Sequence, residues 1–489
     1  MIGKSSRDAG RWEFWIDVGG TFTDLLARAP DGSMLRQKLL SSGVVPGSIS
    51  SLGQQGFCDP SAPPVPSQFW QQSRLVIERP EKGAPFETSV REFDSREGRF
   101  ELSDPLPGWA NEGTSYRLVP GLEAPLLAIR QALGILPSES IPDCSVRLGT
   151  TRGTNALVTR QGAATALVTT QGLGDILSIG NQDRLGLFDL QARKNVPLFS
   201  AVVEIEERIA ADGKVIMSLD PEQARRQLAG LHEKGIESLA ICLLNSYGND
   251  RHEKQLGEIA RELGFRYLSL SSEVAPLIKI VSRGDTTVVN AYLDPVLVDY
   301  IGRLQAGLSS SSRLRLLTSA GGLVSPDAFM GKDSILSGPA GGLVGCAGVA
   351  RSAGFSRAIG FDMGGTSTDV SRFDGQFEYE YETEKAGVRL VTPMMAIQTV
   401  AAGGGSLCQF DGVKLTVGPG SAGADPGPAC YGRGGPLALT DMNLLLGKIR
   451  TERFPLPLDL QAVEQQLSGL IDQVENTSGT RYQPLELAD

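Results

Sequence analysis

The sequence Asp17-Val18-Gly19-Gly20-Thr21-Phe22-Thr23-Asp24 has a second copy far along the chain, Asp362-Met363-Gly364-Gly365-Thr366-Ser367-Thr368-Asp369. Six of the eight positions are identical, and only the second and the sixth differ. Short apolar runs precede both copies and strand-prone residues follow them, which predicts a strand, a Gly-Gly turn and a second strand. Two ordinary hairpin turns are the alternative, but turn chemistry alone does not explain why both acids are retained. We therefore interpret the two stretches as β-hairpins in two related lobes of an α/β protein.

A Gly-Gly turn leaves the tip of a hairpin without side-chain bulk. Backbone N–H groups can then approach an anion closely, and the neighbouring Thr and Asp residues add oxygen ligands. We predict that the hairpins bind the phosphates of one nucleotide. Asp17 and Asp362 end their strands and are the candidate catalytic acids and Mg²⁺ ligands, directly or through water. The candidate cofactor-binding residues are Gly19, Gly20, Thr21, Thr23, Asp24, Gly364, Gly365, Thr366, Ser367, Thr368, Asp369, Gly403, Gly404 and Gly405.

Two of these candidates, Asp24 and Asp369, allow two interpretations. Each acid follows the Gly-Gly turn of its hairpin by a few residues. Its carboxylate either binds water on the metal ion or caps the turn, and the sequence does not decide between these roles.

The composition is that of an ordinary globular protein, and it lacks the excess of basic residues that nucleic-acid binding requires. The chain has 489 residues, of which 41% are hydrophobic and 21% charged, and this length favours two or three domains. Its net charge of -10 argues against binding nucleic acid or an anionic membrane. Anionic ligands would have to be held by backbone amides, a few arginines and a metal ion.

The numbers and spacing of cysteine and histidine residues indicate a cellular compartment and limit the kinds of metal site that we expect. The six cysteines form no C-x-x-C pair, which fits free thiols in a reducing compartment. No apolar run reaches the roughly 18 residues of a membrane helix, and the polar N-terminus has no signal region, so we expect a cytoplasmic protein. The two histidines, His232 and His252, are too few for a histidine-rich metal site, and we expect His252 on a helix surface.

The order of the expected elements indicates an α/β fold with one insertion. Residues 43–110 combine Ser, Gly and Pro with short alternating runs, which predicts a β-rich insertion. Strand-like and helical segments alternate from residue 220 to residue 269, as in βαβ units. The loop 149–155 connects a strand to a helix, and its small hydroxyl residues favour anion binding over a simple helix cap. Residues 461–474 have the pattern of an amphipathic helix.

Other nucleotide and hydrolase signatures are incomplete or absent. Gly418, Gly420 and Gly423 fit G-x-G-x-x-G, but a Pro-rich segment follows them where the dinucleotide fingerprint requires a helix. Neither G-x-x-x-x-G-K-[ST] nor G-x-S-x-G occurs, which excludes a P-loop and a nucleophile elbow. Phosphate chemistry at the two hairpins remains.

The chain resembles the hydantoinase A/5-oxoprolinase family, part of the actin–hexokinase superfamily of ATPases, and is closest to the 5-oxoprolinase branch. The matches run through nearly the whole chain. Besides the hairpins they include Gly149-Thr150-Thr151, Thr154-Asn155-Ala156-Leu157, Ala166-Leu167-Val168-Thr169-Thr170, Asn181-Gln182-Asp183-Arg184, Phe188-Asp189-Leu190, Val289-Asn290-Ala291-Tyr292-Leu293, residues 337–345, Ser371-Arg372-Phe373, residues 399–406 and Asp425-Pro426-Gly427-Pro428-Ala429-Cys430.

The resemblance implies two RNase H-like lobes of the actin/hexokinase type with a nucleotide cleft, and it places the β-rich insertion in the first lobe. The expected domains are residues 12–205, an N-terminal domain, and residues 206–489, which carry the second hairpin. We expect the second domain to be short at its C-terminal end, so that the second lobe is incomplete. The implied activity is ring opening of a cyclic amide, of the 5-oxoproline or hydantoin type, with ATP and Mg²⁺ as cofactors and phosphorylation of the amide carbonyl.

The resemblance also implies partners. These are a cyclic amide small molecule and a hydantoinase B-type subunit or domain, and we expect an oligomer. Two alternatives stay open: an ATP-using subunit of a complex of the acetone or acetophenone carboxylase type, and a non-catalytic nucleotide-binding subunit. The sequence does not identify the substrate, because its loops contain no interpretable pattern of charges.

Overall fold

The computed structural model describes residues 10–20, 22–79, 84–182, 196–423, 426–454 and 458–489, and the chain divides into two compact units. Unit 1 comprises Met1–Gly341 and Tyr379–Met395, and unit 2 comprises Gly342–Glu378 and Ala396–Asp489. This division differs from the boundary near residue 205 that we predicted. A cut at residue 205 would separate strands that pair with each other in one sheet of unit 1, so strand pairing overrides the sequence-based boundary.

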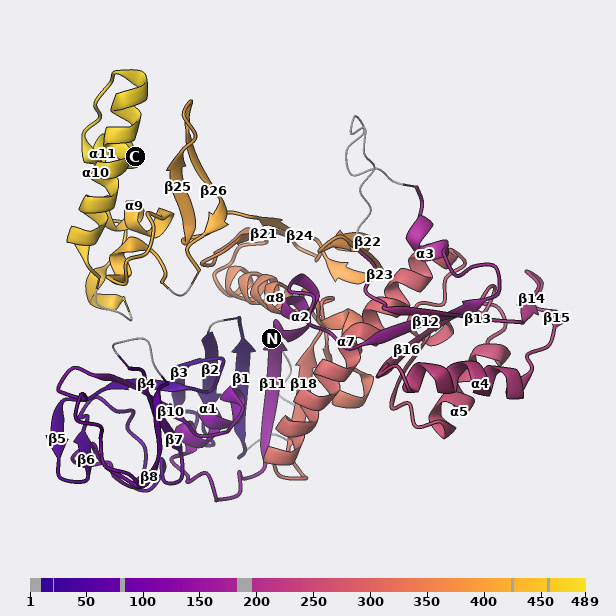
Figure 1. The fold of residues 1–489 in the computed structure, drawn as a ribbon, viewed down its shortest axis with the longest axis horizontal. Helices are drawn as coiled ribbons and strands as arrows, with labels where there is room; N and C mark the ends of the chain where they lie inside the picture. The colour runs from indigo at the N-terminus through magenta and orange to yellow at the C-terminus, as the bar shows by residue number, and fades with distance from the viewer. Residues whose placement is uncertain (1–9, 21, 80–83, 183–195, 424–425, 455–457) are drawn as a thin grey trace. The chain divides into compact units, whose positions relative to one another are not determined.

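The first hairpin lies at the centre of a sheet in unit 1 (Figure 1). The strand order is β19 (Leu323–Val324), β18 (Arg313–Leu317), β11 (Cys144–Thr150), β1 (Trp12–Val18), β2 (Phe22–Arg28) and β3 (Met34–Leu40). Strands β1 to β3 are antiparallel, whereas β11 runs parallel to β1 and β18 runs parallel to β11. The carboxyl ends of β1 and β11 therefore lie at one edge, beside the hairpin tip.

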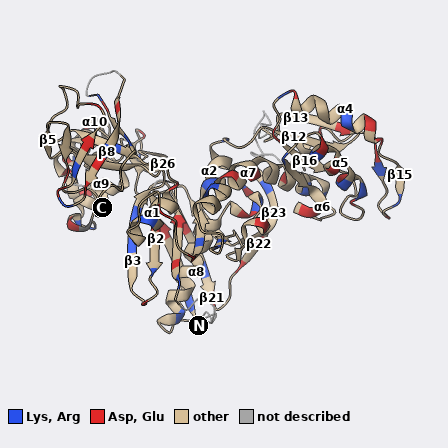
Figure 2. Ribbon diagram, turned by 90° about the horizontal axis from the view of Figure 1, so that it is seen from below, with Lys and Arg blue, Asp and Glu red and all other residues tan. Residues whose placement is uncertain are grey.

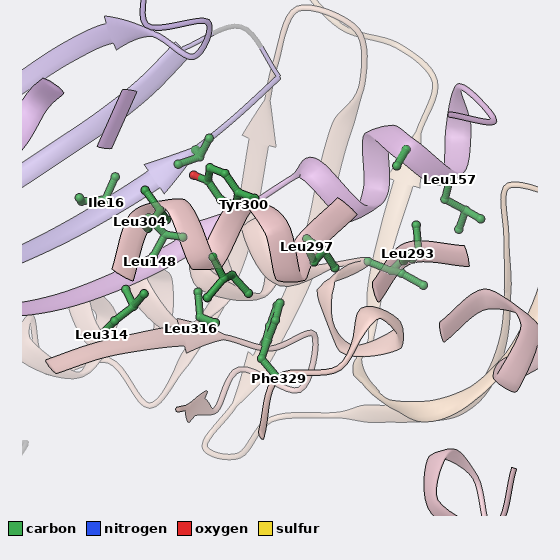
Figure 3. Close-up of a cluster of buried hydrophobic side chains, with 14 of the residues drawn as sticks. Ile16, Leu148, Leu157, Leu293, Leu297, Tyr300, Leu304, Leu314, Leu316 and Phe329 are labelled. Carbon is green, nitrogen blue, oxygen red and sulfur yellow. The ribbon is translucent and has the colours of Figure 1, made fainter. Parts of the chain in front are cut away.

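One buried cluster joins this sheet to the helices α1 (Ala124–Leu133) and α7 (Ile280–Gly307). Figure 3 shows Leu304 and Tyr300 of α7 beside Ile16 of β1 and Leu148 of β11. Each fully buried aliphatic side chain of this kind contributes about 1.5 to 3 kcal/mol to folding. The cluster thereby fixes β1, and with it the position of the first hairpin.

The β-rich insertion predicted for residues 43–110 is confirmed, and it extends to Val119. Its strand order is β4 (Val45–Ser48), β10 (Ser115–Val119), β7 (Arg74–Ile77), β8 (Phe86–Asp94), β9 (Arg99–Leu102), β6 (Gly56–Cys58) and β5 (Ser51–Gly53). Aromatic residues form its core, with Phe57 stacked on Phe100 at a ring distance of 5.0 Å. The insertion has a core of its own because alternating apolar residues face one side of the sheet.

The predicted βαβ alternation is also confirmed, as a parallel sheet in unit 1. Its order is β13 (Ala201–Ile205), β12 (Thr165–Thr170), β16 (Ser238–Cys242) and β17 (Tyr267–Leu270), with the helices α4 (Pro221–His232) and α5 (Arg251–Glu262). Acidic and basic residues are interspersed along α4 and α5 (Figure 2), and the apolar residues of both helices are buried against the sheet.

Shorter elements complete unit 1. They are α2 (Arg152–Val158), α3 (Ile176–Ile179), α6 (Ser271–Val274), β14 (Arg208–Ile209), β15 (Val215–Met217), β22 (Tyr379–Lys385), β23 (Val388–Met395) and the 3₁₀ helices η1 (Pro326–Ala328) and η2 (Gly331–Ser334).

His252 is buried, and our expectation of a helix-surface residue was wrong. Its side chain is 3% exposed, and Nδ1 lies 2.7 Å from Oε2 of Glu207, which is also buried. His252 shares one face of α5 with Leu256 and Ile259, at helical spacings of four and seven residues. The buried carboxylate of Glu207 supplies the polar partner that makes this burial acceptable.

The next residue of α5, Glu253, is the centre of a buried hydrogen-bond network. Its Oε1 accepts from the N–H of Leu243 and the hydroxyl of Ser271, and its Oε2 accepts from the N–H of Ser272. The fully buried Arg283 of α7 donates nearby to the carbonyls of Leu277 and Leu243. The network ties α5 and α7 to the carboxyl ends of β16 and β17.

Replacing Asp285 by Asn is expected to remove part of the pH dependence of stability. Burial on α7 raises the pKa of Asp285 to about 7, and the charge of Arg389 offsets only part of this shift. A raised native pKa stabilises the protein below the unfolded pKa of about 4, and this stabilisation is lost as the pH rises through 7. From pH 5 to pH 8 the natural chain should lose about 2 to 3 kcal/mol relative to Asp285→Asn.

Thermal unfolding of both proteins at pH 5 and pH 8 measures this difference. Because other carboxyl groups titrate in both proteins, the comparison isolates Asp285. Identical pH dependence of the two unfolding temperatures would contradict the prediction.

Unit 2 contains the second hairpin. Its strands are β20 (Arg357–Met363), β21 (Thr368–Asp374) and β24 (Ile397–Val400), which form one sheet in this order, and the separate hairpin β25 (Ser406–Phe410) with β26 (Leu415–Ser421). The helices are α8 (Ser337–Ser352), whose first residues belong to unit 1, α9 (Leu439–Leu445), α10 (Leu460–Ser478), α11 (Pro484–Ala488), and the 3₁₀ helices η3 (Ala429–Tyr431) and η4 (Thr451–Arg453).

Two predictions for this unit are confirmed. Helix α10 covers the predicted range 461–474, and its apolar face packs with Met442 and Leu444 of α9. Gly418 and Gly420 lie inside β26, which pairs with β25 in a hairpin, so they do not open the helix of a dinucleotide fold. Among the described residues, no helix is both long and apolar enough to cross a membrane.

Candidate functional site

The two copies of the repeated sequence adopt the same backbone arrangement. In the first hairpin Asp17 pairs with Asp24, and the N–H of Gly19 donates to the carbonyl of Phe22 over 2.9 Å. In the second, Asp362 pairs with Asp369, and the N–H of Gly364 donates to the carbonyl of Ser367, also over 2.9 Å. Sequence repetition is thus matched by repetition of register and of turn hydrogen bonding.

The hairpin tips are open. Gly20 and Gly365 are exposed, and within the described residues neither N–H makes a hydrogen bond. A methyl group added to Gly365 would meet nothing within 4 Å, and one on Gly20 would lie 3.5 Å from Nδ2 of Asn155. Neither glycine has a positive φ, so these positions need glycine for space and not for a left-handed backbone. Two unpaired donors without neighbouring side-chain bulk fit an anionic ligand.

The carboxylates of Asp17 and Asp362 are exposed at the ends of β1 and β20. A methyl group on Gly149 would lie 3.4 Å from Oδ1 of Asp17, so the missing side chain in β11 leaves room for this carboxylate. Gly342 of α8 does the same for Asp362, with its added methyl 4.0 Å from Oδ2. Each acid therefore stands in front of a glycine and close to its hairpin tip.

The remaining threonines divide into exposed and buried positions. Thr366 is exposed at the tip and Ser367 is half-buried, whereas Thr21 lies outside the described residues. Thr23 is fully buried, and its hydroxyl lies 3.0 Å from that of Ser41. Thr368 is also buried, and its hydroxyl donates to the carbonyl of Ala402. Thr23 and Thr368 hold each hairpin to a neighbouring segment, so the structure does not support them as phosphate ligands.

Asp24 and Asp369 take a role that neither of our two interpretations included. Asp24 forms an ion pair with Lys38 of β3, with Oδ2 and Nζ 2.8 Å apart. Asp369 accepts a hydrogen bond from the hydroxyl of Thr399 of β24 over 2.7 Å. Both contacts link the second strand of the hairpin to the third strand of its sheet. Each acid therefore binds across strands and does not cap the turn.

The triple glycine 403–405 lies against the tip of the second hairpin. The N–H of Gly404 donates to the carbonyl of Gly364, and that of Gly405 donates to the carbonyl of Gly365. The N–H of Gly403 donates to Ser406 Oγ. A methyl group on Gly403 would lie 2.7 Å from backbone atoms of the hairpin, so no side chain fits there. These amides are occupied and support the tip, and direct cofactor binding by them stays a prediction.

In unit 1 the loop 149–155 braces the first hairpin. Both the N–H and the hydroxyl of Thr151 donate to the carbonyl of Val18, over 2.9 and 3.2 Å. The hydroxyl of Ser337, at the start of α8, donates to the carbonyl of Thr150. Because these groups are engaged and α2 is short, the loop does not present the free anion site that we predicted. The exposed side chain of Asn155 is the exception, since it lies beside Gly20.

Sequence reasoning identified the loop but did not select Asn155, Ser41 or Ser337 as residues of the site. Ser41 donates to the carbonyl of Gly19 over 2.7 Å and so fixes the base of the turn. Its partner lies 22 residues away in the sequence, and Ser337 lies 187 residues from Thr150. Contacts at such separations leave no local signal; only the Thr-Asn pattern of residues 154–155 pointed towards this region.

Comparison with known families finds two family models that match this chain. Residues 283–489 match the family model described as hydantoinase/oxoprolinase, and residues 112–264 match the hydantoinase/oxoprolinase N-terminal region. The 5-oxoprolinase of Saccharomyces cerevisiae is 42% identical over 373 residues, which cover 68% of this chain. The chain spans only 29% of the length of that relative.

Two solved structures have a similar mixed α/β fold with several sheets. The ATP-dependent caprolactamase from Pseudomonas jessenii has a TM-score of 0.63 at 27% sequence identity, with 97% of this chain and 60% of that chain covered. The nucleotide-free structure of acetone carboxylase has a TM-score of 0.63 at 21% identity, with the same coverage, and supports the fold alone. The resemblance seen in the sequence is confirmed, and the chain belongs to the hydantoinase/oxoprolinase family.

Proposed function

We propose that this chain is the ATP-using component of a ring-opening amidohydrolase that acts on a cyclic amide. The observation that carries the proposal is the repeated hairpin, with the same register, the same turn and, at each tip, an exposed N–H that makes no hydrogen bond within the described residues. We infer the class of substrate from the relatives, which include a 5-oxoprolinase and an ATP-dependent caprolactamase. Both of those names describe chemistry on a cyclic amide.

Phosphoryl transfer depends mainly on positioning and on neutralising charge. The N–H groups of Gly20 and Gly365 would donate to phosphate oxygens, and the absence of side chains there allows close approach. The amide side chain of Asn155 would add a further donor beside Gly20. The buried contacts of Thr23 and Thr368 keep the tips rigid, which lowers the entropy lost when a phosphate is bound.

The acids of the hairpins fit Mg²⁺. Magnesium usually takes one or two protein carboxylates, with phosphates and water filling its other positions. Asp17 and Asp362 are exposed carboxylates of this kind. When bound, the metal ion would neutralise phosphate charge.

The proposed reaction transfers the γ-phosphoryl group of ATP to the oxygen of the amide carbonyl. ADP leaves in this transfer, and phosphorylation makes the carbonyl carbon more electrophilic. One water adds to this carbon, and the ring C–N bond breaks to give an amine and an acyl phosphate in the same molecule. A second water then cleaves the acyl phosphate to a carboxylate and inorganic phosphate. We assign the hydrolytic step to a hydantoinase B-type partner, which the family resemblance implies.

The metal role can be tested through the two acids. Asp17→Ala and Asp362→Ala are each expected to weaken the binding of Mg·ATP about tenfold or more, since each removes a ligand worth over 1.4 kcal/mol. Both side chains are exposed at strand ends, so the fold should be retained. Isothermal titration calorimetry with Mg·ATP measures the loss, and Asp212→Ala, another exposed acid, is the matched control.

Titration with ATP in the presence of EDTA separates a metal ligand from a phosphate contact. Without metal, loss of a carboxylate should leave ATP affinity unchanged or increase it, because a repulsive charge is removed. Natural affinity for Mg·ATP in both alanine variants would refute the metal role.

A further inference from the structure

An arginine at the start of α2 is held by side chains from two other helices of unit 1. Nη2 of Arg152 donates to Oε2 of Glu123, the N-cap residue of α1, over 2.8 Å. The guanidinium of Arg152 also lies over the ring of Tyr300 of α7, with its carbon 4.1 Å from the ring centroid. Tyr300 is 0% exposed and belongs to the buried cluster of unit 1 (Figure 3). Arg152 is thus fixed by a charged hydrogen bond and by a cation–π contact.

The carboxylate of Glu123 is fully engaged by arginines. Although Glu123 stands at the N-cap of α1, its side chain accepts no hydrogen bond from the first turn of that helix. Its second oxygen, Oε1, accepts instead from Nε of Arg303 of α7 over 2.7 Å. The side chain of Glu123 is only 17% exposed, so water screens these contacts less than it screens a surface ion pair. Glu123 therefore joins the starts of α1 and α2 to α7.

Arg152 stands between two residues that contact the first hairpin. The preceding residue, Thr151, donates its N–H and its hydroxyl to the carbonyl of Val18. Asn155 lies one turn further along α2, where its N–H donates to the carbonyl of Thr151 over 2.8 Å. The side-chain amide of Asn155 lies beside Gly20. A shift at Arg152 would therefore change both contacts with the hairpin.

Helix α2 depends on tertiary contacts for its position. It has seven residues, which is too short for a helix to be stable by itself. Its N-cap residue, Thr151, makes no side-chain cap hydrogen bond, because the hydroxyl is engaged by Val18. Within the helix, the hydroxyl of Thr154 donates to the carbonyl of Ile335. The ion pair of Arg152 adds a charged contact at the first residue, next to the hairpin.

We propose that Arg152 is a positioning residue for the first hairpin, an inference that rests on the function proposed above. Through Glu123 and Tyr300 its side chain fixes the start of α2. Thr151 and Asn155 then keep the hairpin tip in the shape in which its exposed N–H donates to a phosphate. A donor that is already in place binds more tightly, because less conformational freedom is lost on binding.

Arg152→Ala tests this role, with Arg303→Ala as the matched control. Both changes remove an arginine from the same carboxylate, but only Arg152 belongs to the loop that braces the hairpin. Arg152→Ala is expected to weaken the binding of Mg·ATP about tenfold in calorimetric titration, and Arg303→Ala less than about twofold. Without nucleotide, amide hydrogen exchange in residues 17–20 should accelerate in Arg152→Ala only, and exchange in residues 362–365 should change in neither variant.

Glu123→Gln separates positioning from a direct contact between Arg152 and phosphate. For a positioning role, Glu123→Gln should also weaken the binding of Mg·ATP, and the double variant should bind no more weakly than Arg152→Ala, because both changes break one link. If Arg152 contacted phosphate directly, Glu123→Gln would leave the affinity unchanged or increase it, since the guanidinium would be released. Arg152→Met, whose stem can still cover the ring of Tyr300, replaces Arg152→Ala if the latter does not fold.

Four results would overturn the proposal. They are natural Mg·ATP affinity in a folded Arg152 variant, equal losses of affinity in Arg152→Ala and Arg303→Ala, unchanged exchange in residues 17–20, and unchanged or increased affinity in Glu123→Gln. A natural chain that binds no Mg·ATP would refute the proposed function, and this inference with it. Natural binding that the Arg152 variants leave intact would refute the inference alone.

Discussion

Gly365→Val is expected to weaken ATP binding by about 100-fold, or nearly 3 kcal/mol, with little change in thermal stability. The tip of the second hairpin is open around Gly365, with nothing within 4 Å of an added methyl group, and its φ is not positive. The fold therefore tolerates a β-branched side chain there. Phosphate binding is lost, however, because the valine side chain would fill the space in front of the exposed N–H that the phosphate needs. Gly20→Val should act in the same way at the first tip.

Calorimetric titration with Mg·ATP and thermal unfolding measure the two effects separately. Gly108→Val is a suitable control, since Gly108 is also exposed, has no neighbour within 4 Å of an added methyl group and has no positive φ. Natural ATP affinity in folded Gly20→Val and Gly365→Val proteins would mean that the hairpins have only a structural role.

Glu253→Ala is expected to destabilise the parallel sheet of unit 1 by about 3 to 5 kcal/mol. Glu253 is fully buried, and its carboxylate accepts hydrogen bonds from Leu243, Ser271 and Ser272. Alanine would leave two backbone N–H groups and one hydroxyl without an acceptor, and it would remove the negative charge near the buried guanidinium of Arg283. This is the largest loss of stability that we expect from a single side chain of the network.

Hydrogen exchange of the amides in β12 and β16 reports the stability of this sheet. Glu258→Ala is the matched control, because Glu258 lies on the exposed side of the same helix. A Glu253→Ala protein whose β16 amides exchange as slowly as those of Glu258→Ala would contradict the prediction. Glu253→Gln should show an intermediate loss, since its single oxygen retains some of the acceptor capacity.

The sequence by itself determined the elements whose signals are local. The Gly-Gly turns between strand-prone runs predicted both hairpins, and in the structure the two hairpins have the same register and an equivalent turn hydrogen bond. The alternating residues of the insertion and the amphipathic pattern of α10 are likewise read within about 20 residues. The repeat of the eight-residue motif could also be recognised in the sequence, because two copies can be compared without knowing which segments are neighbours in the fold.

Tertiary structure alone decided which members of each hairpin are free to bind a ligand. Thr23 and Thr368 match in the sequence as tip hydroxyls, yet they are buried against Ser41 and Ala402. Asp24 and Asp369 are engaged by Lys38 and Thr399 on neighbouring strands. These partners come from other elements, so their positions depend on strand order and register.

Dependence on partners from other elements also explains why the strands that precede the two motifs differ in burial. Phe14 and Ile359 occupy equivalent positions just before the two repeated motifs, but among the described residues only Phe14 lies under a helix and beside a parallel strand. The segments that cover Phe14 are more than 100 residues away in the sequence. A hydrophobic pattern predicts that a face needs cover, while the fold of the whole chain decides whether that cover is present.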